Sequence, residues 1–125
     1  MANKIILADT SIFIDHFRKS DKSNSKLIGL YDHGYRFCIS SITEYEIYYG
    51  AADKQIEYWR EFLSDINIIS FDSNAAQAAV KISKLLKLKS KQIDNADLFI
   101  AATAISNNLP IATFFERIDN LTLID

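Results

Sequence analysis

Ile5-Ile6-Leu7-Ala8-Asp9-Thr10-Ser11 is the stretch that decides the fold, a short apolar run that ends in an acid and two hydroxyl residues. A continuously apolar run of this length is typical of a parallel strand that is covered on both faces. Ligand sites in open α/β sheets form at the carboxyl ends of such strands. Asp9 can therefore be a ligand, or it can cap the helix that follows. The residues leave both roles open.

Strand and helix patterns alternate outward from this stretch. Strands are expected over residues 4–8, 36–40, 66–71 and 111–113, with an edge strand over 121–124. Helices are expected over residues 11–17, 27–31, 41–50, 52–65, 74–88 and 96–107, the first with Thr10 or Ser11 as its N-cap. This order predicts one α/β domain over residues 1–125, a central parallel sheet of about four or five strands flanked by helices in three α/β/α layers.

Composition narrows the class of protein. The chain has 125 residues, enough for one hydrophobic core, and a single cysteine, Cys38, which we expect to be buried. The absence of a disulfide pair, a signal peptide and a long apolar span indicates a cytoplasmic protein without a membrane segment. The net charge is −2, so any role with nucleic acid must depend on a local basic patch or on a bound metal.

Two further acids stand beside helix patterns. Glu46 lies within the helix expected over 41–50, and Glu44 is roughly 200° around that helix, so the two cannot face the same way. Glu46 has the more apolar neighbours and is our candidate for a site. Asp97 lies in the first turn of an almost wholly apolar helix, where the helix dipole favours an acid. Asp94 can cap that helix, so Asp97 is not needed as a cap and is a candidate for a functional site.

Three carboxylates that meet at one sheet edge repel one another unless they are protonated or neutralised by a hard cation. If Asp9, Glu46 and Asp97 converge, the sequence predicts a metal site. The two histidines, His16 and His33, have no ligand spacing, and we expect both at the surface.

Three sequence blocks carry a resemblance to a known family. They are Asp9-Thr10-Ser11 with Ile14-Asp15, then residues 43–51, then residues 97–104, and the segment 109–113 closes the set. In this order and at this chain length they resemble the PIN domain and, more narrowly, the VapC toxins of bacterial toxin–antitoxin pairs.

The resemblance implies an endoribonuclease toxin that hydrolyses RNA with Mg²⁺ or Mn²⁺. Asp9, Glu46 and Asp97 match the family's metal-binding acids, and Thr10 and Ser11 match the hydroxyl residues beside the first acid, which orient water or phosphate. It also implies a VapB-like antitoxin partner and a homodimer. The family usually carries a fourth acid or amide in a loop after the residue matched by Thr113, and here that loop is several residues short. The alternative is therefore a PIN-fold binding module with weakened or lost catalysis.

The same sequence bears on a second class of enzyme, the phosphatases, and on two kinds of surface, basic and aromatic. A phosphatase of the haloacid dehalogenase kind needs an acid two residues after Asp9, where Ser11 stands. Two groups of basic residues are either solvated faces or phosphate contacts. One comprises Lys81, Lys84, Lys87, Lys89 and Lys91, and the other comprises Arg18, Lys19, Lys22 and Lys26. An aromatic concentration is expected mostly in the core, and it comprises Tyr45, Tyr48, Tyr49, Tyr58 and Trp59.

Overall fold

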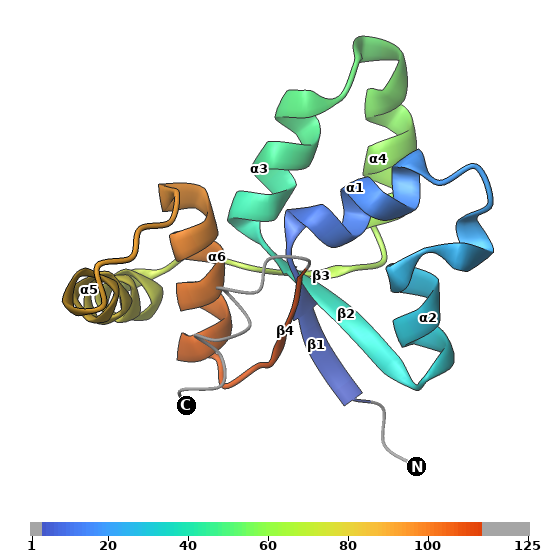
Figure 1. The fold of residues 1–125 in the computed structure, drawn as a ribbon. Coiled ribbons are helices and arrows are strands. Elements are labelled where there is room, and N and C mark those ends of the chain that lie inside the picture. The colour runs from blue at the N-terminus through green and yellow to red at the C-terminus, as the bar shows by residue number, and fades with distance from the viewer. Residues whose placement is uncertain (1–3, 114–125) are drawn as a thin grey trace.

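A parallel sheet in the order β3-β2-β1-β4 lies at the centre of the computed structural model, which describes residues 4–113 (Figure 1). Its strands are β1 (Lys4–Ala8), β2 (Tyr35–Ser40), β3 (Asn67–Ile69) and β4 (Ile111–Ala112). Leu7 pairs with Cys38 on one side of β1, and Ala8 pairs with Ala112 on the other. The predicted parallel sheet is confirmed, although β3 is shorter than predicted. The expected edge strand over 121–124 lies outside the described residues.

Helices connect these strands. They are α1 (Thr10–Arg18), α2 (Lys26–Asp32), α3 (Ser41–Gly50), α4 (Ile56–Leu63), α5 (Ser73–Leu88) and α6 (Asn95–Ser106), with the 3-10 turns η1 (Lys22–Asn24) and η2 (Asp53–Gln55). The single helix predicted over 52–65 is divided, because the Gln55 side chain accepts a hydrogen bond from the Ala52 N–H at 3.0 Å and closes η2 before α4 begins. Within residues 4–113, every helix is too short or too polar to cross a bilayer.

Alternate residues of the strands enter two separate cores. Ile6, Ala8 and Ile39 pack with α1, α3 and α4 on one face of the sheet. Leu7 and Cys38 pack with α5 and α6 on the other face. Figure 1 shows these two helix groups on opposite sides of the strands. The predicted three layers are therefore confirmed. So is the burial of Cys38, which raises the pKa of its thiol.

The strand order creates a crevice beside β1. The chain runs from β1 through β2 to β3 in one direction, then returns through α5 and α6 to place β4 on the other side of β1. Such a reversal leaves an opening at the carboxyl ends of the two flanking strands. Asp9 and Thr113 leave the sheet there, and the Asp9 N–H donates to the Ala112 carbonyl at 3.0 Å. The topology thus places the first acid at the position where α/β sheets bind ligands.

His16 is buried, so the expectation of a surface residue was wrong. It shares a helical face with Ile12 and Phe13, which enter the core. Its Nδ1 lies 2.8 Å from the hydroxyl of Ser25, the N-cap of α2. Burial, together with Lys22, lowers the pKa of its imidazole. The other histidine, His33, is exposed as predicted.

The aromatic concentration is mostly outside the core, and this expectation was also wrong. Among the five, Trp59 alone is fully buried, at 4% exposure. Tyr45 and Tyr49 stack on each other one turn apart on α3 and are 62% and 80% exposed. The aromatic residues of α3 lie on one side of the helix by their spacing, whereas its buried residues, Thr43 and Ile47, lie on the opposite side.

Candidate metal-binding active site

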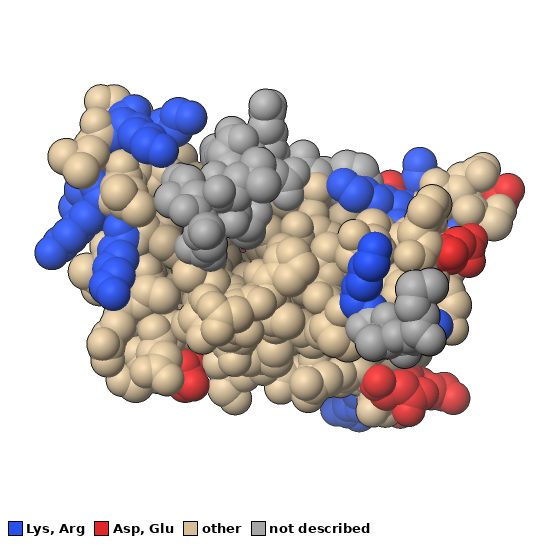
Figure 2. Space-filling view, turned by 90° about the horizontal axis from the view of Figure 1, so that it is seen from below, with Lys and Arg blue, Asp and Glu red and all other residues tan. Residues whose placement is uncertain are grey.

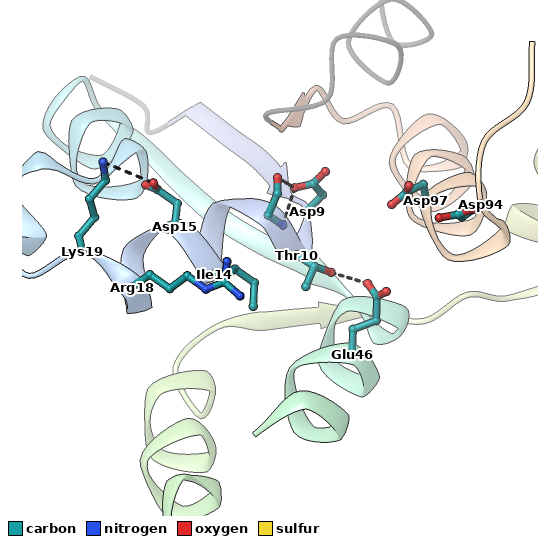
Figure 3. A pocket seen from close by; sticks show the side chains of 10 residues that line it. Asp9, Thr10, Ile14, Asp15, Arg18, Lys19, Glu46, Asp94 and Asp97 are labelled. Carbon is teal, nitrogen blue, oxygen red and sulfur yellow. Dashed lines mark hydrogen bonds and ion pairs between the residues drawn. The ribbon is translucent and has the colours of Figure 1, made fainter. Parts of the chain in front are cut away.

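A pocket of about 720 Å³ opens at the carboxyl edge of the sheet. It is lined by Asp9, Thr10, Ser11, Ile14, Asp15, Arg18, Lys19, Glu46, Asp94 and Asp97. These side chains come from the carboxyl end of β1, from the whole length of α1, from α3 and from the start of α6 (Figure 3). The three acids singled out from the sequence, and Thr10, therefore share one pocket.

Asp9 is the N-cap of α1, one of the two roles that the sequence left open for it, and the other cap candidates, Thr10 and Ser11, are the first residues of the helix. Its Oδ1 accepts hydrogen bonds from the Ser11 N–H at 3.0 Å and from the Ser11 hydroxyl at 2.5 Å. The residue is 1% exposed, and Oδ2 is buried with no hydrogen-bond partner among residues 4–113. Burial raises the pKa of the carboxyl, although hydrogen bonding with Ser11 and the nearby Thr113 hydroxyl lowers it in part. One oxygen thus caps the helix, whereas the other has no hydrogen-bond partner within residues 4–113.

Glu46 is oriented by residues from two helices. The Thr10 hydroxyl donates to Glu46 Oε1 at 2.6 Å, and the fully buried Thr43 hydroxyl lies 3.2 Å from Thr10 Oγ1. These bonds join α1 to α3 across 36 residues of sequence. Glu44 lines a different hollow, with Tyr48 and Arg60 among its neighbours. The choice of Glu46 over Glu44 for this pocket is confirmed.

Asp94 and Asp97 enter the pocket from the start of α6. Asp94 occupies the N-cap position as expected, yet its side chain makes no capping hydrogen bond. Asp97 lies in the first turn, and Figure 3 shows its carboxylate directed across the pocket toward Asp9. Buried small residues of α6, including Ala101 and Ala102, let this helix pack closely on the sheet and on α5. That close packing brings its acidic first turn to the edge of the sheet.

The donor set fits a hard divalent cation. Asp9 Oδ2 is a buried oxygen without a partner in the described structure, which is costly unless a cation or another group satisfies it. Mg²⁺ takes oxygen ligands, usually one or two carboxylates with several waters. Within residues 4–113, however, no three His, Cys, Asp or Glu side chains come close enough to hold one ion. Asp9, Glu46 and Asp97 thus share a pocket without converging on a point, and their role as metal ligands stays a prediction.

Asp15 and Ile14 belong to the pocket although sequence reasoning assigned them no role. Asp15 accepts a hydrogen bond from the Lys26 N–H at 3.1 Å and pairs with Lys19 at 3.7 Å. The signal that could have found them is helical spacing, since positions three to four and seven residues after Ser11 lie on the same face of α1. The loop after Thr113, where the family's fourth acid or amide is expected, lies outside the described residues.

Comparison with known proteins places the chain in a family. The family model for the PIN domain matches residues 6–122. Ribonuclease VapC1 of Methanocaldococcus jannaschii is 35% identical, over 94% of this chain and 84% of that protein. The tRNA(fMet)-specific endonuclease VapC of Salmonella typhimurium is 31% identical, over 72% of this chain and 75% of that protein. The crystal structure of VapBC2 from Rickettsia felis bound to a promoter DNA fragment superimposes with a TM-score of 0.78 and 26% identity, and it covers 93% of this chain and 92% of that chain. The chain therefore belongs to the PIN-domain family and, within it, to the VapC proteins.

Proposed function

We propose that this protein is the endoribonuclease toxin of a toxin–antitoxin pair and that it hydrolyses RNA phosphodiester bonds with Mg²⁺ or Mn²⁺. The observation that carries the proposal is Oδ2 of Asp9, which is buried without a hydrogen-bond partner among residues 4–113, in a pocket that also holds Glu46 and Asp97. The similar VapC proteins of known name are a ribonuclease and a tRNA endonuclease, which supports RNA as the substrate class.

Asp9, Glu46 and Asp97 would hold the cation, directly or through the water molecules that Mg²⁺ keeps. When bound, such an ion lowers the pKa of a water and neutralises the charge that develops on the phosphate. Thr10 holds the Glu46 carboxylate in one orientation through its 2.6 Å hydrogen bond. Ser11 keeps Oδ1 of Asp9 committed to the helix cap, so Oδ2, which has no hydrogen-bond partner within residues 4–113, would be the ligand atom. The chain thus presents oxygens in fixed positions and needs no histidine, cysteine or serine nucleophile.

A VapB-like antitoxin is the proposed protein partner. Structures similar to this chain come from VapBC complexes, among them those of Rickettsia felis and Salmonella typhimurium. We further propose that the protein acts as a homodimer in the cytoplasm. Analytical ultracentrifugation of the purified chain, alone and with its partner, measures whether the protein is a homodimer.

Cleavage should depend strictly on a divalent ion. Incubation of a tRNA pool with purified protein and Mg²⁺ or Mn²⁺ should give discrete fragments, and excess EDTA should abolish them, because the carboxylates alone do not neutralise a phosphate. Denaturing gels with end-labelled RNA measure this. Restoration by added Mn²⁺ after EDTA is the control for irreversible damage. A protein that cuts no RNA under any of these conditions, yet binds a VapB-like partner, would instead be a binding module with lost catalysis.

Loss of the Thr10 hydroxyl should lower the rate without unfolding the chain. Thr10→Val keeps the shape of the side chain but leaves Glu46 without its hydrogen bond, and groups that orient a metal ligand typically contribute roughly 10- to 100-fold in activity. We expect kcat to fall within that range. Thr10→Ser keeps the hydroxyl and should retain most of the activity. Equal activity of the Val and Ser variants would show that the Thr10–Glu46 bond has no part in the reaction.

A further inference from the structure

The pocket is strongly acidic, which is unfavourable for a polyanion. Five acids line it, Asp9, Asp15, Glu46, Asp94 and Asp97. Two cations line it, Arg18 and Lys19. A chain of net charge −2 supplies no attractive overall field. RNA that enters this pocket therefore needs local positive charge, in addition to any metal ion, to hold the phosphates beside the one that is cleaved.

The basic group near α1 comprises Arg18, Lys19, Lys22 and Lys26. Its three lysines form ion pairs or hydrogen bonds within the protein. Lys19 pairs with Asp15 at 3.7 Å. Lys22 donates to the carbonyls of three residues at the end of α1, with distances of 3.0 to 3.3 Å. Lys26 donates to the Thr113 carbonyl at 3.0 Å. These side chains therefore hold α1 and its neighbouring segments together, and they are less available to a ligand.

Arg18 differs from its neighbours. It lies at the carboxyl end of α1, its side chain is exposed, and in the described part of the chain it takes part in neither of the two ion pairs found. Figure 3 shows the side chain extending back past Ile14 into the pocket, at the end opposite Asp94 and Asp97. It also lines a smaller adjoining hollow of about 190 Å³, together with Glu46 and Trp59. The guanidinium thus stands at the junction of two hollows.

The lysines of α5 are a weaker candidate for the same task. Figure 2 shows blue side chains gathered over α5, and Lys81, Lys84 and Lys87 on this helix are exposed. None of them lines the acidic pocket. Helix α5 packs on α6, whose first turn carries Asp97. We therefore retain the interpretation of this stripe as a solvated face and use one of its lysines as a control.

We propose that Arg18 is a substrate-binding residue that holds a non-scissile phosphate of the RNA through paired hydrogen bonds from its guanidinium. The inference rests on the proposed endoribonuclease function and adds a residue to it. Arginine matches phosphate with two parallel N–H donors, which gives geometry as well as charge. Because Asp94 and Asp97 lie at the opposite end of the pocket (Figure 3), the bound strand runs from these two carboxylates along α1 toward Arg18.

The test compares Arg18→Gln with Lys84→Gln, a matched loss of charge on α5. Steady-state cleavage of an end-labelled RNA hairpin gives kcat and KM. Fluorescence anisotropy in the cleavage-impaired Asp97→Asn background gives Kd at several salt concentrations. Arg18→Gln should raise KM and Kd roughly 10-fold at low salt with little change in kcat, and it should reduce the slope of log Kd against log salt by about 0.7. Arg18→Lys should lose less, and Lys84→Gln should match wild type. Circular dichroism checks that each variant is folded.

These measurements distinguish a failure of the phosphate-binding role of Arg18 from a failure of the proposed endoribonuclease function. If wild type neither binds nor cuts RNA, the proposed function fails, and the role of Arg18 fails with it. If wild type cuts RNA but Arg18→Gln keeps its KM and salt slope, the inference alone is overturned. Equal losses in Arg18→Gln and Lys84→Gln would indicate a general charge effect and would also overturn it. An unchanged RNA affinity combined with a weaker antitoxin complex would assign Arg18 to the protein partner instead.

Discussion

Replacement of Asp97 by Asn should abolish RNA cleavage while the fold is retained. Asp97 projects into the pocket from the first turn of α6, and Asn keeps its size but removes its charge. We expect kcat/KM to fall on the order of 100- to 1,000-fold, the size that loss of one electrostatic group typically produces. An acid in a helix's first turn contributes about 0.3–1 kcal/mol to stability, so thermal unfolding should shift by only a few degrees. Single-turnover cleavage of labelled RNA and a melting curve measure the two effects.

Asp94→Asn is the matched control for this variant. Asp94 lies three residues earlier and lines the same pocket, yet Asp97 and not Asp94 matches the family's third acid. Its side chain makes no capping bond that Asn would lose. We expect activity close to that of wild type. If Asp94→Asn were inactive and Asp97→Asn active, the two assignments would have to be exchanged. If both variants were fully active, the carboxylate site itself would be the wrong interpretation.

Asp9→Asn should remove activity and at the same time stabilise the protein. Asn can accept the Ser11 hydrogen bonds through its Oδ1, and Asn caps helices about as well as Asp. The substitution eliminates a buried carboxylate whose second oxygen is unpartnered in the described structure. We expect the thermal midpoint to rise by a few degrees, since about 1 kcal/mol corresponds to roughly 3–6 °C in a chain of this size. Cleavage should fall at least as far as in Asp97→Asn.

The stabilisation by Asp9→Asn should depend on pH in a defined direction. Burial raises the pKa of Asp9 above its ordinary value of 3.8, so the folded state binds more protons than the unfolded state at pH values just above 3.8. Stability from this group is therefore present at low pH and is lost as the pH rises through the folded pKa. The gap in unfolding free energy between the variant and wild type should be small near pH 4 and larger at pH 7. Urea unfolding at the two pH values measures it, and a gap that shrinks as the pH rises would contradict the assignment.

Addition of Mg²⁺ or Mn²⁺ should change the melting temperature of wild type but not that of Asp9→Asn. An ion that binds only the folded state stabilises it, by about 2.7 kcal/mol at 100 times its Kd. Wild type should therefore melt at a higher temperature with the ion than without it, and Asp9→Asn should not respond. The same shift in both proteins would place the ion elsewhere on the chain.

The positions of the acids could be predicted because they depend on local patterns. The apolar run of β1 ends at Asp9, and the ends of parallel strands meet at one edge of a sheet. Helical periodicity separated Glu46 from Glu44, the more apolar neighbours of Glu46 favoured it, and helix-terminus chemistry drew attention to Asp97. Backbone hydrogen bonding and hydrophobic periodicity set these features over a few residues, so they can be read without knowledge of distant contacts.

Tertiary structure decided which atoms are committed and which are available. Asp9 proved to be both a helix cap and a carboxylate whose second oxygen is buried without a hydrogen-bond partner among the described residues. Thr10 meets Glu46 only when α1 packs beside α3, and the buried ring of His16 finds its hydrogen-bond partner in Ser25 at the start of α2. The exposure of Tyr49 likewise follows from the face of α3 that packs on the sheet. The sequence alone therefore determined where the acidic site lies, whereas contacts between elements far apart in the chain determined the hydrogen bonding, orientation and exposure of its residues.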